Sequence, residues 1–371
     1  MRVLHILGEL RPSGAEQMLC SAAASFAKQG VSADVLSTGV QVGTHAHRFE
    51  ESGYTVHHLP FRRHPLFFLS LWRLIRRGGY DVIHLHTERA NFWQGLTVWI
   101  AGVKENLRTV HSNFTFEGRL RRRRGWQRRM LARMGIKHVA ISPTVQHNER
   151  TRFGLETILI SNWYDSNRFK PPTSEQRKQS RIALNVSNDC VLITVGNCSV
   201  VKNHTALMYA MAALPAEQRP IWLHVGEEVK DCTERQLAKK LEIDKQVRFL
   251  GPQADVLPFL HAADLFAMPS LYEGFGVSAI EAIACGLPCL FTDVTGLCDF
   301  KGQFLGLFYC QPDAASLSDS LLKYLDKDAN YWQKVTRENH KVAQRLYSIE
   351  RGVSAYVHLY EASLIGSAFK R

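Results

Sequence analysis

The sequence lacks a long apolar run, a paired-cysteine motif and a recognisable export signal. Although 45% of its 371 residues are hydrophobic, no run of about twenty apolar residues occurs, so a membrane-spanning helix is not expected. The eight cysteines form no C-x-x-C pair and are expected to be reduced, mostly buried thiols. A metal pair at Cys285 and Cys289, across a Gly-Leu-Pro turn, is an alternative for those two. The opening MRVLHILGEL is typical of a first core strand, and these absences together favour a cytoplasmic protein.

Acidic residues are scarce in the first half of the chain. Residues 1–165 carry 23 lysines and arginines against 12 acids, whereas residues 166–371 carry 23 against 22. Nearly all of the net charge of +12 therefore lies in the first half. This asymmetry indicates that the first half faces something anionic.

Two segments concentrate the positive charge and interleave it with tryptophan. Eight arginines and no acid lie between Arg119 and Arg133, and Leu66–Arg77 reads LFFLSLWRLIRR. Basic amphipathic helices with tryptophan suit an anionic membrane surface, where each cation contributes on the order of 1 kcal/mol. The predicted membrane- and acceptor-facing residues are Arg73, Arg76, Arg77, Arg121, Arg122, Arg123, Arg124 and Trp126. A solvated helix face is one alternative; nucleic-acid binding is another, although no nucleic-acid module accompanies the arginines.

Short β-branched runs alternate with helical patterns through the first half. The expected strands are Val3–Leu7, Ala33–Ser37, Thr55–Leu59, Val82–His86, Arg108–Val110, Val139–Ile141 and Thr157–Ile160. The expected helices are Gly14–Lys28, Leu66–Arg77, Arg89–Ala101 and Gly118–Arg133. Strands that alternate with helices predict a parallel, doubly wound sheet.

The second half repeats this scheme. Its expected strands are Val191–Val195, Ile221–Val225, Val247–Leu250, Leu265–Met268 and Cys289–Thr292. Residues 166–180, with a proline pair and polar clusters, are expected to form a linker. The chain is thus predicted to be an α/β protein with two Rossmann-like domains, 1–165 and 181–348. A helical pattern with Val353, Tyr356, Val357 and Tyr360 predicts a last helix within 349–371.

One segment of the second half, PSLYEGFGVSAIEAIACGLPCLFTD from Pro269, carries the clearest chemical signal. Gly274 and Gly276 allow a ligand to approach the backbone closely, and the N-terminus of the helix that follows suits a phosphate. Glu281, inside that helix, suits a diol, and Glu273 on the loop suits a further hydroxylated group. Phosphate, diol and a second hydroxylated group together indicate a nucleotide-sugar. The alternative is a solvated loop and helix with two incidental glutamates.

The pattern E-G-F-G-x4-E-A-x-A-x-G-x-P within this segment closely resembles the signature of the retaining GT-B glycosyltransferases of family 4. The resemblance implies two Rossmann-like, doubly wound domains that face a central cleft, with the C-terminal helix packed back on the first domain. Two further segments are similar to family loops. Val195, Gly196, Asn197 and Lys202 match V-G-R-x4-K except at Asn197, where an arginine is usual, and 13–16 (SGAE) resembles a glycine loop with serine for its first glycine.

By this resemblance the donor-binding residues are Gly14, Gly196, Asn197, Lys202, Leu250, Glu273, Gly274, Phe275, Gly276 and Glu281. Lys202 and the loop amides would stabilise the diphosphate leaving group. Glu281 would hold the ribose, and Leu250 lies where the main chain touches the nucleobase. His111, which follows a parallel strand, would position the transferred sugar beside Glu273. The expected catalytic residues are therefore His111, Lys202 and Glu273.

The implied reaction is transfer of a hexosyl or N-acetylhexosaminyl group, with retention, from a nucleoside diphosphate sugar to a hydroxyl. A UDP-sugar is preferred slightly over a GDP-sugar. The expected acceptor is a lipid-linked sugar in bacterial surface polysaccharide or lipopolysaccharide synthesis, reached peripherally at the inner membrane face. A nucleotide-sugar epimerase of the same fold and a non-catalytic membrane partner that binds nucleotide-sugar are the alternatives.

No cofactor is expected, and no metal ligand is assigned. His84 and His86 form an H-L-H pair, but two ligands without a third make a poor metal site. Core or loop histidines are the preferred interpretation of that pair. Transfer is expected to be metal-independent.

Overall fold

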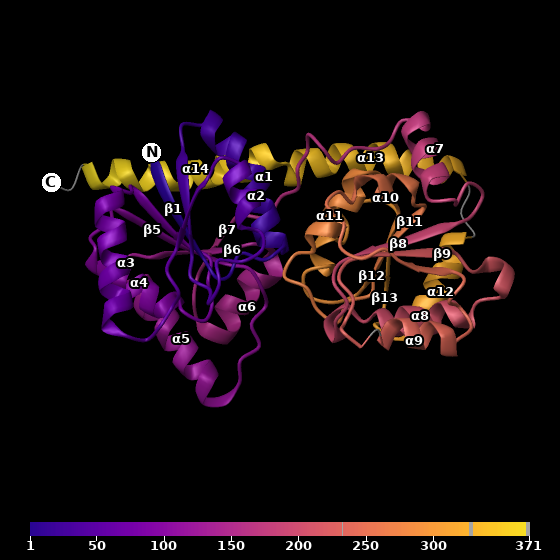
Figure 1. Ribbon diagram of the computed structural model, residues 1–371, viewed down its shortest axis with the longest axis horizontal. Coiled ribbons are helices and arrows are strands. Elements are labelled where there is room, and N and C mark those ends of the chain that lie inside the picture. Colours follow the sequence, from indigo (N-terminus) through magenta and orange to yellow (C-terminus); the bar gives the residue numbers. More distant parts are fainter. Residues whose placement is uncertain (232, 326–328, 369–371) are drawn as a thin grey trace. The chain divides into compact units, whose positions relative to one another are not determined.

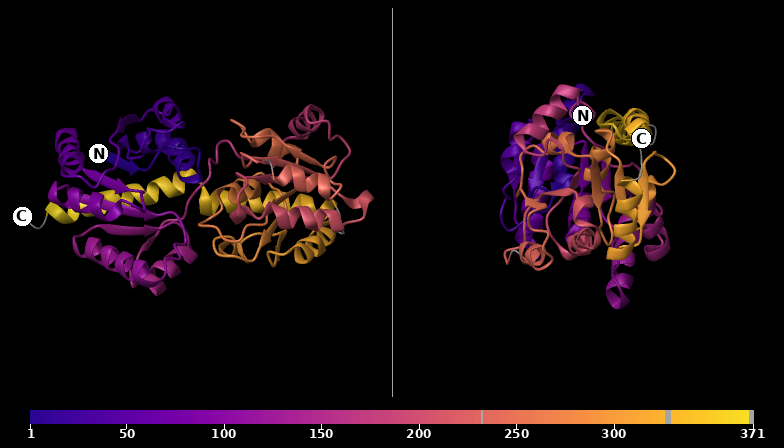
Figure 2. Two further views of the ribbon diagram at one scale, coloured as in Figure 1. Left: turned by 60° about the horizontal axis from the view of Figure 1, so that its bottom comes forward. Right: turned by 90° about the vertical axis from the view of Figure 1, so that its right-hand side faces the viewer.

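The computed structural model describes residues 1–231, 233–325 and 329–368, without the side chains of 329, 330 and 363–368. The chain divides into two compact units. Unit 1 comprises Met1–Asp165 and Ile349–Arg371, and unit 2 comprises Ser166–Ser348. In each unit, helices cover both faces of one parallel sheet (Figures 1 and 2).

Unit 1 is built on a seven-stranded sheet in the order β3-β2-β1-β4-β5-β6-β7. Its strands are β1 (Arg2–Leu7), β2 (Ser32–Ser37), β3 (Thr55–His58), β4 (Val82–Leu85), β5 (Glu105–Val110), β6 (Lys137–Ala140) and β7 (Ile158–Leu159). Val3 on β1 lies opposite Ala33 on β2 and Val82 on β4. The strand order therefore reverses between β1 and β4, which in such sheets marks the ligand crevice.

Helices cover both faces of the unit 1 sheet, because successive residues of its strands are buried on opposite sides. Val3 and Val82 face one side, where α1 and α14 cover them; Leu4 and Ile83 face the other, beneath α3 and α4. The helices are α1 (Gly14–Lys28), α2 (Ala46–Glu51), α3 (Pro65–Gly78), α4 (Asn91–Ile100), α5 (Gly118–Arg133), α6 (Pro143–Phe153) and α14 (Ile349–Ala368). The last helix thus completes the core of the first unit.

Unit 2 repeats the arrangement with six parallel strands in the order β10-β9-β8-β11-β12-β13. They are β8 (Val191–Val195), β9 (Ile221–Val225), β10 (Val247–Phe249), β11 (Leu265–Met268), β12 (Cys289–Thr292) and β13 (Leu307–Cys310). The order reverses between β8 and β11, so the loops that follow these two strands leave the sheet side by side.

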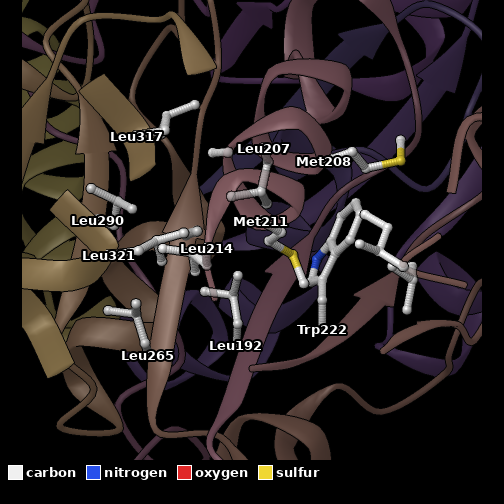
Figure 3. Close-up of a cluster of buried hydrophobic side chains, with 14 of the residues drawn as sticks. Leu192, Leu207, Met208, Met211, Leu214, Trp222, Leu265, Leu290, Leu317 and Leu321 are labelled. Atoms are coloured by element: carbon white, nitrogen blue, oxygen red, sulfur yellow. The ribbon is translucent and has the colours of Figure 1, made fainter. Parts of the chain in front are cut away.

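The helices of unit 2 are α7 (Ser174–Ala183), α8 (His204–Ala213), α9 (Thr233–Lys240), α10 (Leu257–Ala262), α11 (Val277–Ala284), α12 (Ala314–Leu325) and α13 (Ala329–Tyr347), with short 3₁₀ turns η1 (Val200–Lys202), η2 (Ala216–Gln218) and η3 (Cys298–Phe300). One face of the sheet packs Leu192 and Trp222 against Met211 of α8 and Leu321 of α12 (Figure 3). Trp222 is fully buried, and its Nε1 donates to Thr194 Oγ1 on the neighbouring strand at 3.0 Å.

The predicted fold class is confirmed, and four strands match their predicted bounds within unit 2: β8, β9, β11 and β12. β13, α2 and α6 are present although the sequence patterns did not indicate them. The predicted linker, 166–180, is corrected in part, because Ser174–Ala183 form α7 with a Thr173–Gln176 capping box. Asp264 anchors α7: it pairs with Arg177 and Arg181 and accepts from the Val191 amide.

Within the described ranges, no helix combines the length and the apolar character that crossing a bilayer requires.

Candidate functional site

The loops after β8 and β11 form the candidate donor site of unit 2. The first holds Gly196 at φ +149° and the second holds Gly276 at φ +82°, as the N-cap of α11. Both values lie where a side chain is disfavoured, which explains glycine at these positions. A Cβ on Gly196 would also lie only 3.2 Å from Cε of Lys202.

Lys202 and Glu273 meet across these two loops. Lys202 Nζ lies 2.8 Å from Glu273 Oε1, with the two side chains 25% and 14% exposed. Ser270 Oγ donates to the same carboxylate oxygen at 2.7 Å. The structure thus brings together two of the three predicted catalytic residues, as a cation and an anion that a charged ligand could separate.

The two loops are fastened to each other and to their surroundings. The Leu271 amide donates to the Val201 carbonyl at 2.8 Å. Asn203, at φ +54°, donates through Nδ2 to the carbonyls of Pro269 and Pro312. Asn197 Oδ1 accepts from the Glu227 amide at 2.9 Å, so this residue, where the family usually has arginine, supports the neighbouring loop after β9.

The helix α11 carries the remaining donor-site residues of the motif. Ser278 Oγ donates to the Val195 carbonyl at the end of β8, which holds the first turn of the helix against the loop after that strand. Glu281, one turn further along, is partly exposed. Phe275 is buried against Phe300 and Tyr347. Its predicted part in donor binding is therefore limited to the backbone.

Backbone geometry also restricts Gly296 and Leu250. A Cβ on Gly296 would lie 2.6 Å from the Glu273 carbonyl oxygen, so this glycine allows the β12–η3 loop to pass close to the loop that carries Glu273. The Leu250 amide donates to His224 O, and its carbonyl accepts from Gln253 Nε2. Both main-chain groups of Leu250, which is predicted to lie near a nucleobase, are therefore engaged within unit 2.

In unit 1, the predicted glycine loop after β1 leads directly into α1. Ser13 is the N-cap residue of α1, Gly14 is its first residue, and the Ser13 hydroxyl donates to the Glu16 carboxylate. Burial raises the pKa of Glu16 above its usual value, against the opposing effect of Ser13. This segment is an ordered helix start.

His111 lies in unit 1 at the end of a row of hydrogen-bonded histidines. His111 Nε2 is 2.9 Å from His86 Nδ1, and His86 Nε2 is 3.0 Å from His5 Nδ1. Burial lowers the pKa of His5 to about 3, and burial with the Arg108 charge lowers that of His111 to about 4. Near neutral pH each ring therefore carries one N–H, and both hydrogen bonds must run in the same direction along the row.

The arginine-rich helix α5 divides into exposed and buried residues. Arg121, Arg122 and Arg123 are exposed, and Trp126 is 48% exposed. Arg124 corrects the membrane prediction: it is half-buried, and its Nη1 donates to the carbonyls of Glu88 and Arg89.

Arg128 of the same helix is buried in an ion network. Its Nε lies 2.8 Å from Glu149 Oε2 and its Nη2 lies 3.1 Å from Glu88 Oε1. Arg108 Nη2 binds the other oxygen of Glu88 at 2.5 Å. The carboxylates that neutralise Arg128 come from other elements, so the run of arginines in the sequence did not reveal them.

The predicted basic residues of α3 stay on the surface. Arg73, Arg76 and Arg77 are exposed, as are Leu66 (64%) and Trp72 (37%). Phe67 and Leu71 of the same helix are buried in the core of unit 1. The helix therefore presents arginine and apolar side chains together to the outside of unit 1.

Two groups of described side chains have the composition of a metal site, although none was expected. His5 joins His84 and His86 in unit 1, and Cys198, His204 and His224 come together in unit 2. Sequence spacing did not reveal the third histidine of the first group, because His5 reaches the pair only through the β1–β4 pairing. Cys285 and Cys289, the alternative metal pair, are buried thiols outside both groups.

Known protein families and curated proteins are similar to this chain. Residues 12–168 match the family described as Glycosyltransferase Family 4, and residues 175–342 match Glycosyl transferases group 1. The Escherichia coli UDP-Gal:alpha-D-GlcNAc-diphosphoundecaprenol alpha-1,3-galactosyltransferase is 25% identical over 277 residues, which cover 70% of each chain. The Komagataeibacter xylinus GDP-mannose:cellobiosyl-diphosphopolyprenol alpha-mannosyltransferase is 25% identical over 98% of this chain and 94% of its own.

A solved structure supports the same fold. The crystal structure of Anabaena Alr3699/HepE in complex with UDP aligns with a TM-score of 0.83 and 19% identity over 98% of this chain and all of that one. Two adjacent family matches and a full-length likeness of fold lead to one conclusion. The chain belongs to the group 1 glycosyltransferases of family 4 and has the GT-B fold.

Proposed function

We propose that the chain transfers a sugar, with retention, from a nucleoside diphosphate sugar to a hydroxyl of a lipid-linked saccharide. The observation that carries this proposal is the Lys202–Glu273 pair of 2.8 Å beside the Gly276 N-cap of α11. A cation next to a helix N-terminus is suited to a diphosphate leaving group, which needs charge stabilisation more than a strong acid.

The pair gives Lys202 a partner before any donor arrives. When the diphosphate binds, its oxygens replace the Glu273 carboxylate at the lysine. Glu273 is then available to accept hydrogen bonds from sugar hydroxyls and to orient the anomeric carbon. Glu281, on the partly exposed side of α11, would accept both hydroxyls of the ribose.

The transfer step needs no further nucleophile in this scheme. The acceptor hydroxyl attacks from the face that the diphosphate leaves, through an oxocarbenium-like step, and the departing phosphate accepts the hydroxyl proton. His111 is neutral near pH 7 because of its lowered pKa. Its predicted contact with the transferred sugar would therefore be a hydrogen bond and not an ion pair. Metal-independent transfer stays a prediction, with Lys202 and the loop amides as the electrostatic partners of the leaving group.

The donor and acceptor classes are supported by relatives. The E. coli relative is named for UDP-Gal and a diphosphoundecaprenol, and the K. xylinus relative for GDP-mannose and a diphosphopolyprenol. The structure in complex with UDP is in keeping with a uridine donor. A polyprenol acceptor lies in a membrane, which fits the exposed arginines and tryptophans of α3 and α5 as a peripheral contact with anionic lipid.

A donor screen followed by product analysis tests the proposal. We expect one nucleoside diphosphate sugar to raise the melting temperature, because a ligand that binds only the folded state stabilises it. With that donor and a polyprenyl diphosphate sugar, NMR of the product should show the anomeric configuration of the donor. Sugar conversion without an acceptor would instead identify an epimerase. Donor binding without any turnover would identify a non-catalytic partner.

A further inference from the structure

Behind the Lys202 loop, three buried side chains of unit 2 converge without a role in the proposed transfer. Cys198 lies on the loop after β8, His204 is the first residue of α8, and His224 lies on β9. Their exposed fractions are 7%, 4% and 0%. Each offers one ligand atom, and these atoms all lie within 4.8 Å of one another.

The separations suit a small cation with little movement. With Zn–S near 2.3 Å and Zn–N near 2.0–2.1 Å, tetrahedral ligands lie roughly 3.3–3.8 Å apart. The three ligand atoms lie within 4.8 Å of one another, and the rings of His204 and His224 have centroids 4.8 Å apart. Small rotations of the side chains would close the remaining gap.

The hydrogen bonding of His224 resembles that of a metal ligand. Its Nε2 lies 3.0 Å from the Gly196 carbonyl oxygen, which can only accept, so Nε2 carries the proton and Nδ1 keeps its lone pair. Metal-binding histidines commonly donate the second N–H to such a carbonyl. Among the described residues, neither Nδ1 of His224 nor Nδ1 of His204 has a hydrogen-bond partner. A buried polar atom without a partner costs free energy, which a bound cation would recover.

The surroundings select the kind of cation. One thiol and two imidazoles favour a borderline-soft ion such as Zn²⁺ over Mg²⁺ or Ca²⁺. Phe249 packs 5.5 Å from the His224 ring, and Trp222 packs 5.8 Å from the His204 ring, so one side of the group is apolar. Glu234, in the first turn of α9, interacts with the Cys198 thiol.

We propose that Cys198, His204 and His224 bind one Zn²⁺ ion that fastens the Lys202 loop to α8 and β9. On binding, the Cys198 thiol loses its proton to solvent, and the thiolate and two neutral imidazoles form the bonds to zinc. The site is structural: it holds the loop that carries Gly196 and Lys202, and it takes no part in breaking the sugar–phosphate bond. It therefore goes beyond the proposed transfer and does not depend on it.

Cobalt spectroscopy on the whole chain tests the proposal directly. The reduced protein, cleared of metal with a chelator, is titrated with Co²⁺. We expect one equivalent to bind with the thiolate-to-cobalt charge-transfer band and the intense visible bands of a tetrahedral site. Zn²⁺ should then abolish both, and Zn²⁺ alone should raise the melting temperature by several degrees. Absence of a charge-transfer band in the wild-type protein would overturn the proposal without any variant.

Matched variants assign the site. Cys198→Ser should remove the charge-transfer band, and His224→Gln should weaken Co²⁺ binding at least tenfold. Cys310→Ser, at another buried thiol of unit 2, and His5→Gln, in the histidine group of unit 1, should change neither. A band that persists in Cys198→Ser would contradict the proposal. Donor binding by the metal-free protein is measured separately, so loss of the zinc proposal and loss of the transferase proposal are distinguishable.

Discussion

At the scale of single residues, Lys202 has the clearest expected effect. Its charge contacts the bound diphosphate and stabilises it most strongly as the sugar–phosphate bond breaks, so Lys202→Ala should lower kcat by roughly 10²–10³-fold with a smaller change in KM. The matched control is Lys301→Ala, which removes another lysine of unit 2 that pairs with a carboxylate, at Asp293. Steady-state kinetics with the identified donor compares kcat of Lys202→Ala with kcat of Lys301→Ala. An unchanged kcat in Lys202→Ala would remove this residue from the site.

Glu281 is expected to act on binding instead of turnover. A carboxylate that accepts two hydroxyl hydrogen bonds contributes about 1.5–3 kcal/mol for each charged contact, so Glu281→Ala should weaken donor binding by roughly tenfold or more. Isothermal titration calorimetry with the nucleoside diphosphate measures the change. Glu217→Ala, at an exposed acid of η2, serves as the control. Equal affinity of the two variants would argue against the ribose contact.

Residues in local motifs could be predicted from the sequence, whereas partners from distant parts of the chain could not. Lys202 and Glu273 each lie in a contiguous pattern, and the structure pairs them. Arg128 lies among eight arginines and gives no local sign that Glu88 and Glu149 bury it. These partners follow from strand order and helix packing, which are properties of the folded chain.

At the scale of elements, α14 depends on one close approach. A Cβ on Gly352 would lie 2.1 Å from the ring of Trp163. Alanine normally favours a helix over glycine by about 1 kcal/mol, but overpacking here should reverse the sign and destabilise unit 1 by about 1–3 kcal/mol. Urea unfolding followed by tryptophan fluorescence measures the loss. Ser354→Ala on the same helix should cost less; a more stable Gly352→Ala would show that α14 is packed less closely.

The exposed arginines of α5 are predicted to govern membrane contact. Replacing Arg121, Arg122 and Arg123 by alanine removes on the order of 3 kcal/mol of attraction to anionic lipid, or roughly a hundredfold in affinity. Flotation with vesicles that contain anionic lipid, at low and rising salt, measures binding. Replacing Lys239, Lys240 and Lys245 of unit 2 changes the net charge equally and should leave flotation intact. A wild-type protein that fails to float at low salt would end the membrane proposal.

Some helices and strands could be predicted from their local sequence pattern, whereas others depend on partners far along the chain. Gly14–Lys28 and Gly118–Arg133 match their predicted bounds, because each is a long helical pattern between clear ends. α7 follows a proline pair, and the sequence pattern there indicates a linker. The Asp264 carboxylate that pairs with the arginines of α7 lies far along the chain, so the local pattern does not show it. The sequence pattern does not indicate β13, which the structure shows paired with β12.

At the scale of the whole molecule, buried histidines make stability depend on pH. Burial lowers the pKa of His5 to about 3 and that of His111 to about 4, and places those of His84, His86 and His138 well below the usual value. The unfolded chain binds these protons near pH 6.5 and the folded chain does not. The contribution of these neutral histidines to the free energy of unfolding is therefore fully present above about pH 6.5. It is lost as the pH falls toward 4, by up to about 1.4 kcal/mol per pH unit for each histidine.

Urea unfolding at pH 7.5 and pH 5.5 measures this loss, since most carboxylates stay ionised over that range. We expect a lower free energy of unfolding at pH 5.5 and a smaller difference in His111→Gln. His358→Gln, at an exposed position of α14, should keep the full difference. Equal stability of the wild-type protein at both pH values would contradict burial of neutral imidazoles.

Because α14 packs into unit 1, this unit can complete its fold only after α14 has been synthesised. The strands of unit 1 leave the ribosome first, yet the helix that covers Val3 and Val82 follows only after all of unit 2 has been made. Until then, α1 alone covers that apolar face of the nascent sheet, and the part that α14 will cover is open to chaperones or to association with other chains. A premature stop codon late in the gene would therefore damage the domain that was translated first.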